Sequence, residues 1–302
     1  MFNLFKSALW MLLIGYFSAS VAFAEDAAPA AEKGMSAEEF LASLHFKSGK
    51  IDLPNGIATL DLPETFQYLD PADSEKVLVD AWGNPPGNTS LGMIFPAGTS
   101  PLDKAAWGVV ITYDEDGHVK DDDADSINYT DLLKDMQEGE KEANEERKKQ
   151  GYSALNLMGW AEKPSYDKAT HKLFWAKELS VEGATEHTLN YNVRILGRKG
   201  VLVLNAIAGT SQLGTVKTEM QKVIAFSDFK PGNNYGDFDS GTDKTAEYGI
   251  AALVAGGVAA KLGFFGKIFA LILAFKKLLI LAVIGFFAGI KKFLGFGKDK
   301  QE

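Results

Sequence analysis

The chain has 302 residues, a formal net charge of −9 and no cysteine. The lack of cysteine excludes a disulfide framework, a thiol nucleophile and a thiolate metal site. Every formal charge between Tyr248 and Lys298 is a lysine, so the preceding part is more acidic than the total suggests. An acidic surface repels phosphates, and we therefore expect no nucleic-acid partner.

The first residues have the pattern of an export signal. Residues 1–24 contain Lys6, the apolar stretch Ala8 to Phe17 and the small-residue ending Ala22-Phe23-Ala24. The apolar stretch is shorter than the roughly 20 residues of a membrane span, which favours a cleaved signal peptide over an anchor. Residues 25–35 are mainly Ala, Pro and Glu and predict a flexible spacer.

The sequence predicts strands through the first half of the domain. Residues 51–53 and 58–62 flank Pro54-Asn55-Gly56, a turn sequence that favours a hairpin. Further strands are expected at 76–79, 91–95 and 107–113, and in the last of these the apolar residues alternate on one face.

A helix is then expected from Asp131 to Gln150, with Thr130 as its cap and Gly151 as its stop. Its charged residues are those of a solvated helix face. Strand patterns return at 153–161, 172–179, 189–196 and 201–208, and a second helix is expected at 212–226.

These elements predict an α+β fold, because short connections between strands require antiparallel neighbours. We expect a mainly antiparallel sheet with two packed helices, preceded by the signal peptide and followed by a hydrophobic helical tail. The domain is assigned to residues 36–230, a linker to 231–247 and a membrane-associated tail to 248–298.

One group of acidic residues has the oxygen chemistry that calcium prefers. The five carboxylates are those of Asp114, Asp116, Asp121, Asp122 and Asp123. The spacing departs from the helix–loop–helix calcium pattern, because His118 stands at the third ligand position and Gly117 comes early. A solvated turn explains the same residues, so calcium is a hypothesis and no other cofactor is expected.

Catalytic motifs are missing from the sequence. The four histidines are scattered, and no nucleophile elbow, phosphate-binding glycine loop or dinucleotide motif is present. We therefore do not expect an enzyme. Trp82 and Trp160 stand beside glycine and proline, as ligand contacts on loops do, although core tryptophans flanked by turns have the same pattern.

The tail is rich in Ala, Gly, Leu, Ile, Phe and Lys. Ala252, Gly256 and Ala260 are four residues apart, which predicts a small helix face suited to close helix packing. A span over 249–275 buries Lys261, whereas a span over 268–290 buries the pair Lys276-Lys277 near the membrane centre. A surface-bound amphipathic tail is the alternative.

Several short stretches resemble a bacterial family of membrane-anchored proteins known only as a domain of unknown function, number 2167. The stretches lie at 117–124, 144–152, 159–167, 171–179, 189–202 and 248–257. The resemblance implies the same plan of signal, outer domain and membrane tail, and no established activity. The order of elements from Tyr166 to Ser227 is also similar, at the level of fold, to photosystem accessory proteins and nuclear-import factors.

Three functions are compatible with this plan. The first is a membrane-anchored, periplasm-facing binding or accessory module at the inner membrane of a Gram-negative envelope. The second is an envelope enzyme with a carboxylate-lined site, and the third is a membrane protein that associates through its tail. The expected partners are membrane lipid and either an envelope protein or a second copy of the chain.

Overall fold

The computed structural model describes residues 35–87 and 89–256. The predicted signal peptide, nearly all of the spacer and the tail from residue 257 lie outside the described residues. Two antiparallel sheets and several helices make up the described part, which confirms the α+β class. Within these residues no helix is long and apolar enough to cross a membrane.

The smaller sheet has the strand order β1-β2-β10. β1 (Gly49–Asp52) and β2 (Ala58–Leu62) form the predicted hairpin, and β10 (Ser227–Phe229) pairs with the other side of β2. Gly56 in the turn has a φ of 70°, a conformation that glycine adopts without strain.

The larger sheet has seven strands in the order β3-β4-β5-β9-β8-β7-β6, all antiparallel. Its strands are β3 (Phe66–Leu69), β4 (Gly92–Pro96), β5 (Gly108–Asp114), β6 (Leu155–Asp167), β7 (Lys172–Val181), β8 (Thr188–Leu196) and β9 (Val201–Gly209). The strands predicted at 91–95 and 107–113 and the four predicted after the helix are confirmed, whereas β3 was not predicted.

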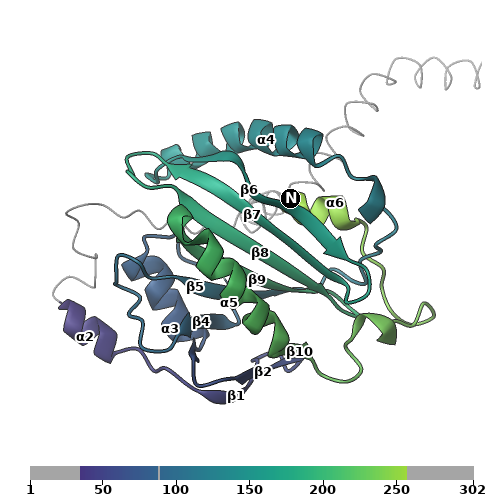
Figure 1. Ribbon diagram of the computed structural model, residues 1–302, viewed down its shortest axis with the longest axis horizontal. Helices are drawn as coiled ribbons and strands as arrows, with labels where there is room; N and C mark the ends of the chain where they lie inside the picture. Colours follow the sequence, from purple (N-terminus) through teal and green to yellow (C-terminus); the bar gives the residue numbers. More distant parts are fainter. Residues whose placement is uncertain (1–34, 88, 257–302) are drawn as a thin grey trace, which may run out of the picture.

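The outer, convex face of the large sheet carries the main core. Helix α5 (Leu213–Ala225) confirms the second predicted helix, and with the small sheet it covers this face (Figure 1). Alternate residues of β8, among them Tyr191 and Val193, are buried there against Val216, Met220 and Val223. The apolar face of the strands, which recurs every second residue, therefore packs against the apolar stripe of α5.

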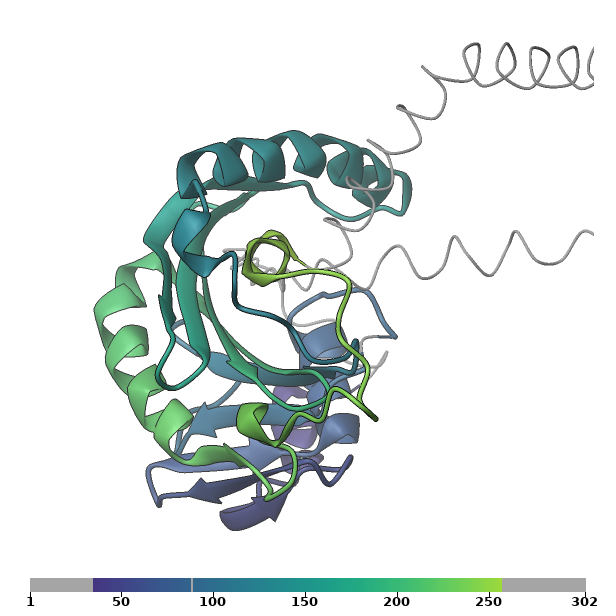
Figure 2. The same cartoon turned by 90° about the vertical axis from the view of Figure 1, so that its right-hand side faces the viewer.

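The inner face of the large sheet is curved around helix α6 (Ile250–Ala255), with α4 (Tyr129–Lys149) along its rim (Figure 2). Two short helices, α2 (Ala37–Ala42) and α3 (Pro71–Lys76), cover the part of this face near β3 to β5. The inner face thus holds three smaller apolar clusters instead of one continuous core.

Two local predictions are wrong. The strand expected at 76–79 is helical, because Asp70 caps α3, Pro71 begins it, and a π-helical turn (Val77–Ala81) continues it. Val77 and Leu78 are both fully buried from this helical turn, so tertiary packing outweighs the strand preference of the valines. The cap of α4 is Asn128 and not Thr130, since the Asn128 side chain accepts from the N–H groups of residues 130 and 131.

The segment assigned to a linker, residues 231–247, is packed onto the domain. It contains a short 3₁₀ turn (Tyr235–Asp237), and the Arg198 guanidinium forms an ion pair with Asp243 at 2.7 Å. Beyond it, the first residues assigned to the tail form α6, whose Ile250, Leu253 and Val254 are at most 2% exposed in the core. The proline, glycine and asparagine residues of this segment predict the end of the domain, but in the structure the chain turns there and returns to the sheet.

Candidate functional site: the acidic loop and the C-terminal segment

The acidic loop (residues 114–125) follows β5 and lies against the C-terminal segment (residues 231–256). The two pair through their backbones, since the His118 N–H donates to the Lys244 carbonyl and the Ala246 N–H donates to the His118 carbonyl, each at 2.8 Å. A Cβ at Gly117 would lie 2.7 Å from the Lys244 oxygen, and its φ of 110° disfavours other residues. Gly117 therefore permits this close approach.

Two carboxylates of the loop hold the C-terminal segment where α6 begins. Asp116 accepts a hydrogen bond of 2.8 Å from the Tyr248 hydroxyl. Asp123 accepts from the backbone N–H groups of Ile250 and Ala251 at 2.9 and 3.1 Å. These amides have no partner within the helix, so Asp123 satisfies the first turn of α6 from a distant part of the chain.

A third carboxylate joins three segments. Asp121 accepts from the Tyr166 hydroxyl at 2.8 Å and from the Tyr235 hydroxyl at 3.3 Å, and the His171 Nδ1 lies 3.6 Å away. Burial alone would raise the pKa of Asp121, but the bond from Tyr166 and the charge of Lys168 hold it below its usual value. Burial and the Asp121 charge raise the pKa of Tyr235 to about 12, so this hydroxyl remains a donor at neutral pH.

Four rings stack beside this carboxylate. Phe238 stacks on His118 with ring centroids 4.0 Å apart, His118 lies 4.2 Å from Tyr235, and Tyr235 lies 3.9 Å from His171. His118 is 7% exposed, and its Nδ1 has no hydrogen-bond partner among the described residues. Burial lowers the pKa of His118, and the backbone of residues 197 and 198 offsets part of that effect. The acidic loop, the rings and the C-terminal segment together form what we call the C-terminal clamp.

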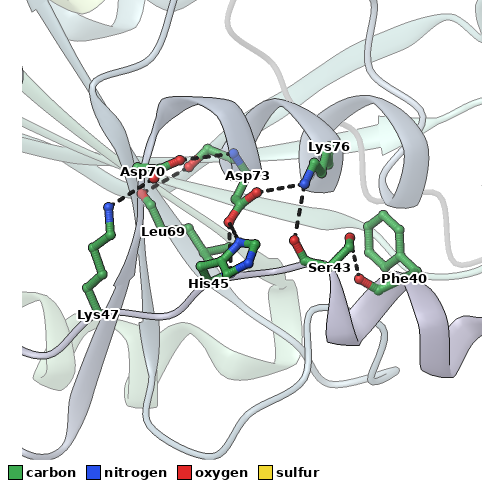
Figure 3. A network of polar contacts seen from close by, with 9 residues as sticks. Phe40, Ser43, His45, Lys47, Leu69, Asp70, Asp73 and Lys76 are labelled. Carbon is green, nitrogen blue, oxygen red and sulfur yellow. Dashed lines mark hydrogen bonds and ion pairs between the residues drawn. The ribbon is translucent and has the colours of Figure 1, made fainter.

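A second polar network holds the N-terminal end of the described chain (Figure 3). Asp73 on α3 accepts from the His45 N–H at 2.7 Å and from Lys76 at 2.8 Å, and the Lys76 ammonium also donates to the Ser43 carbonyl. Burial alone would raise the pKa of Asp73, but the bonds from Lys76 and His45 bring it below its usual value. This carboxylate fixes residues 43–45 against α3.

The structure does not bring the five predicted calcium ligands together. Asp116, Asp121 and Asp123 bond to three different parts of the C-terminal segment and its neighbours, while Asp114 and Asp122 are exposed. Within residues 35–87 and 89–256 no group of three or more His, Asp or Glu side chains could share a metal ion. The carboxylates bind hydroxyl and amide donors of the protein, and the calcium hypothesis has no support from this geometry.

The two tryptophans suggested as ligand contacts are buried or partly buried. Trp82 is 6% exposed, and its indole N–H donates to the Pro101 carbonyl at 3.0 Å. Trp160 is partly buried between β6 and α4, and its indole N–H donates to the Tyr129 carbonyl at 3.2 Å. Both indole N–H groups therefore have hydrogen-bond partners within the protein.

The small helix face predicted in the tail is interrupted in the structure. Ala252 lies in α6, but Gly256 follows the end of that helix with a φ of 100°, and Ala260 lies outside the described residues. Because Gly256 adopts a left-handed conformation here, it ends the helix and does not continue a packing face.

An open depression of about 370 Å³ lies beside α4 and is lined by Lys141, Asn144, Glu145, Lys148, Ala154, Asn156 and Glu182. Its ion pair joins Lys148 to Glu182 at 3.3 Å. Both side chains are more than half exposed, and exposed ion pairs contribute little to stability. We therefore place the candidate site at the C-terminal clamp.

Sequence reasoning missed most of the clamp. Tyr166 lies 45 residues from Asp121, and Tyr235 lies 114 residues from it, so no local spacing could indicate the contact. The stretches that carry the family resemblance do include Tyr166, His171 and Tyr248. That resemblance was the one signal in the sequence, although it did not indicate that these residues meet.

The fold and the clamp define an α+β domain with a curved antiparallel sheet whose inner face receives the chain's own C-terminal segment. The chain belongs to the family described as "Protein of unknown function (DUF2167)", whose model matches residues 45–287. No curated protein matches the sequence significantly.

Three solved structures show a distant similarity. They are the cyanobacterial PsbP of Synechocystis sp. PCC 6803 (15% identity, 63% of this chain, 94% of that chain, TM-score 0.32), the Ran-binding protein Mog1p of Saccharomyces cerevisiae (10%, 65%, 100%, 0.33) and LpqN of Mycobacterium tuberculosis (14%, 65%, 98%, 0.31). LpqN is described as involved in cell envelope biogenesis of that bacterium. At these TM-scores the similarity indicates no function.

Proposed function

We propose that this protein is a non-catalytic binding or accessory module of the bacterial envelope, with its folded domain facing the periplasm and its C-terminal tail in the inner membrane. The observation that carries the proposal is the C-terminal clamp. It holds the chain against the sheet as far as α6, so that the apolar, lysine-bearing stretch from residue 257 begins directly at the domain.

The signal-peptide pattern of residues 1–24 supports export, and the composition of the tail supports membrane attachment. The carboxylates of the acidic loop support a structural role for that loop, because three of them bond to protein donors. A clamp without a flexible linker would fix the domain at a short, defined distance from the membrane surface.

The test uses single cysteines in the full chain, which has none of its own. Lys168→Cys lies in the exposed turn between β6 and β7, and Lys298→Cys lies near the C-terminus. Cells with a permeabilised outer membrane are treated with a membrane-impermeant thiol reagent. Labelling at residue 168 alone indicates an odd number of crossings, and labelling at both indicates a hairpin or a surface-bound tail. Labelling at neither position contradicts export.

One observation favours an envelope enzyme as the second candidate. Asp121, Tyr166 and His171 are titratable groups from different segments, and the Tyr166 hydroxyl lies within hydrogen-bond distance of the other two. Against it, the Asp121 oxygens already accept from two tyrosine hydroxyls. If the purified chain hydrolysed generic ester, phosphate or glycoside substrates, and Asp121→Asn abolished that activity, the enzyme would replace the accessory module.

A further inference from the structure

The inner face of β7 and β8 carries two cations and several hydrogen-bond donors, two of which have no acceptor among the described residues. Because Ala176 and Tyr191 face the convex core, Lys177 on β7 and Asn190 on β8 face inward, and the two are directly opposite in register. Trp175, Asn192 and Arg194 share this inner face. We call the five inward-facing residues, Trp175, Lys177, Asn190, Asn192 and Arg194, the inner patch.

Two buried donors of the inner patch have no acceptor among the described residues. Asn190 is fully buried, and its Nδ2 group is unpaired, while its two oxygens accept from Asn192 at 2.9 and 3.2 Å. Trp175 is 1% exposed, and its indole N–H is also unpaired. Buried donors usually have a partner, so two unpaired donors on one face indicate an external acceptor.

The positive charge on this face is only partly compensated. Among the described residues Lys177 and Arg194 take part in no ion pair. The Arg194 guanidinium donates to the Val193 carbonyl at 3.2 Å and lies over the Trp175 ring at 4.9 Å. Burial lowers the pKa of Lys177 to about 8, with the Arg194 charge as a second cause. Burial lowers the pKa of Arg194 to about 10, although the charge of Asp114 acts against it. Glu140 on α4 favours protonated Lys177, but burial raises the pKa of Glu140, and its Oε2 already accepts a backbone N–H of β6.

Residues 257–298 carry only lysines as charged groups, so this stretch supplies no anion, and the acidic residues of the tail are Asp299 and Glu302 at its end. The inner patch offers donors and positive charges, which is the chemistry of an oxyanion site. Two cations match a phosphate group, which can carry up to two negative charges, better than a single carboxylate. We propose that the inner patch binds a phosphate group, with Lys177 and Asn190 as its central contacts and Arg194 at its edge.

This site would give the proposed binding module its ligand class, although binding of a phosphate group does not depend on membrane attachment. The thiol-labelling experiment tests attachment, and the experiment below tests the site, so either proposal can fail while the other stands. Two sources have the same chemistry, namely a free phosphate anion and the headgroup of an anionic phospholipid.

The purified full chain in neutral detergent is heated with increasing inorganic phosphate at constant ionic strength, and separately with dihexanoyl phosphatidylglycerol. We expect a saturable rise of about 2–4 °C in the unfolding midpoint with at least one of them. A response to inorganic phosphate shows that a free anion is sufficient for binding. A response to the lipid alone shows that the site binds the headgroup of a phospholipid. No saturable response to either overturns the proposal.

Lys177→Met should abolish the response, and Lys177→Arg should retain it. Lys172→Met is the matched control, because Lys172 lies on the same strand but faces away from the inner patch. Lys177→Met should also raise the midpoint without ligand, since it removes a buried charge that has no counterion in an ion pair. An equal phosphate response in Lys177→Met and Lys172→Met, or a lower ligand-free midpoint in Lys177→Met alone, contradicts the site.

Discussion

Gly117 lies where the acidic loop crosses the C-terminal segment, and two physical reasons require glycine there. Its φ is positive, and a side chain would meet the Lys244 carbonyl oxygen at 2.7 Å. The contact is between two backbones, so neither can move aside without breaking the hydrogen bonds of His118. The close approach of the two backbones therefore depends on glycine at this position.

Gly117→Ala should lower the free energy of unfolding by about 1–3 kcal/mol through backbone strain, and by more if the loop cannot shift. Urea unfolding followed by tryptophan fluorescence measures the difference. Gly183→Ala is the control, because Gly183 has a φ of 91° but no atom within 4 Å of an added Cβ. Equal losses in the two variants would mean that the close approach at Gly117 adds nothing.

Asp73 is the corresponding residue at the N-terminal end. Asp73→Asn keeps the shape of the side chain but removes the charge that Lys76 and His45 bond to, so we expect a loss of about 1–3 kcal/mol in unfolding free energy. Because its folded pKa is lowered, Asp73 stabilises the fold above its unfolded pKa, and this contribution disappears as the pH falls through the folded pKa. Denaturation at pH 7 and at pH 3 tests both statements, since the difference in unfolding free energy between parent and variant should become smaller in acid.

At the scale of elements, α4 covers the open edge of the large sheet. Asn144 bonds to both backbone groups of Leu155 at 2.7 and 2.8 Å, and Gln137 and Glu140 bond to the carbonyl and the N–H of Leu157. A helix spaces these side chains three and four residues apart, while the outward groups of β6 recur every second residue. The helix thus takes the place of a neighbouring strand and blocks edge-to-edge pairing.

Asn144→Ala should therefore destabilise the domain by about 1–3 kcal/mol, because it leaves two backbone groups of β6 without their partner. Hydrogen exchange should accelerate at Leu155 while the strands at the centre of the sheet stay protected. Glu142→Ala, on the exposed side of the same helix, should change neither quantity. Unchanged exchange at Leu155 in Asn144→Ala would show that α4 does not protect this edge.

The same helix shows how far the sequence could predict the fold. The helical pattern and Gly151 located α4 to within two residues of its observed ends, and period-two alternation located most strands. The buried side of α4 includes the polar residue Glu140, which the hydropathy pattern assigns to the solvated face. The carboxylates of the acidic loop stood out in the sequence, but their partners are more than 40 residues distant and were not predictable. Periodicity reports which face is apolar, and it carries no information about which distant polar group bonds to a carboxylate.

At the scale of the whole molecule, carboxylates hold both ends of the described chain to the domain, Asp73 at one end and Asp116, Asp121 and Asp123 at the other. The C-terminal end also depends on His118, which is buried in its neutral form within the ring stack. Its pKa is lowered by burial, so the unfolded chain binds a proton more readily than the folded one. Stability from this group is present above its unfolded pKa of about 6.5 and is lost as the pH falls below it.

We therefore expect the C-terminal clamp to loosen in mild acid before the sheet does. Hydrogen exchange of the full chain in detergent, compared at pH 7.5 and pH 5.5 after correction for the intrinsic rate, should show lost protection at 244–251 and unchanged protection in β8 and β9. His118→Phe keeps an aromatic ring between Phe238 and Tyr235 but cannot take up a proton. In this variant the clamp should therefore be equally protected from exchange at both pH values. The Asp121 carboxylate favours protonated His118 and therefore opposes the lowering of the His118 pKa. Because the pKa of Asp121 is itself lowered, Asp121 keeps its charge until the pH is well below that of mild acid. Equal pH dependence in the parent and in His118→Phe would assign the acid sensitivity of the clamp to groups other than His118.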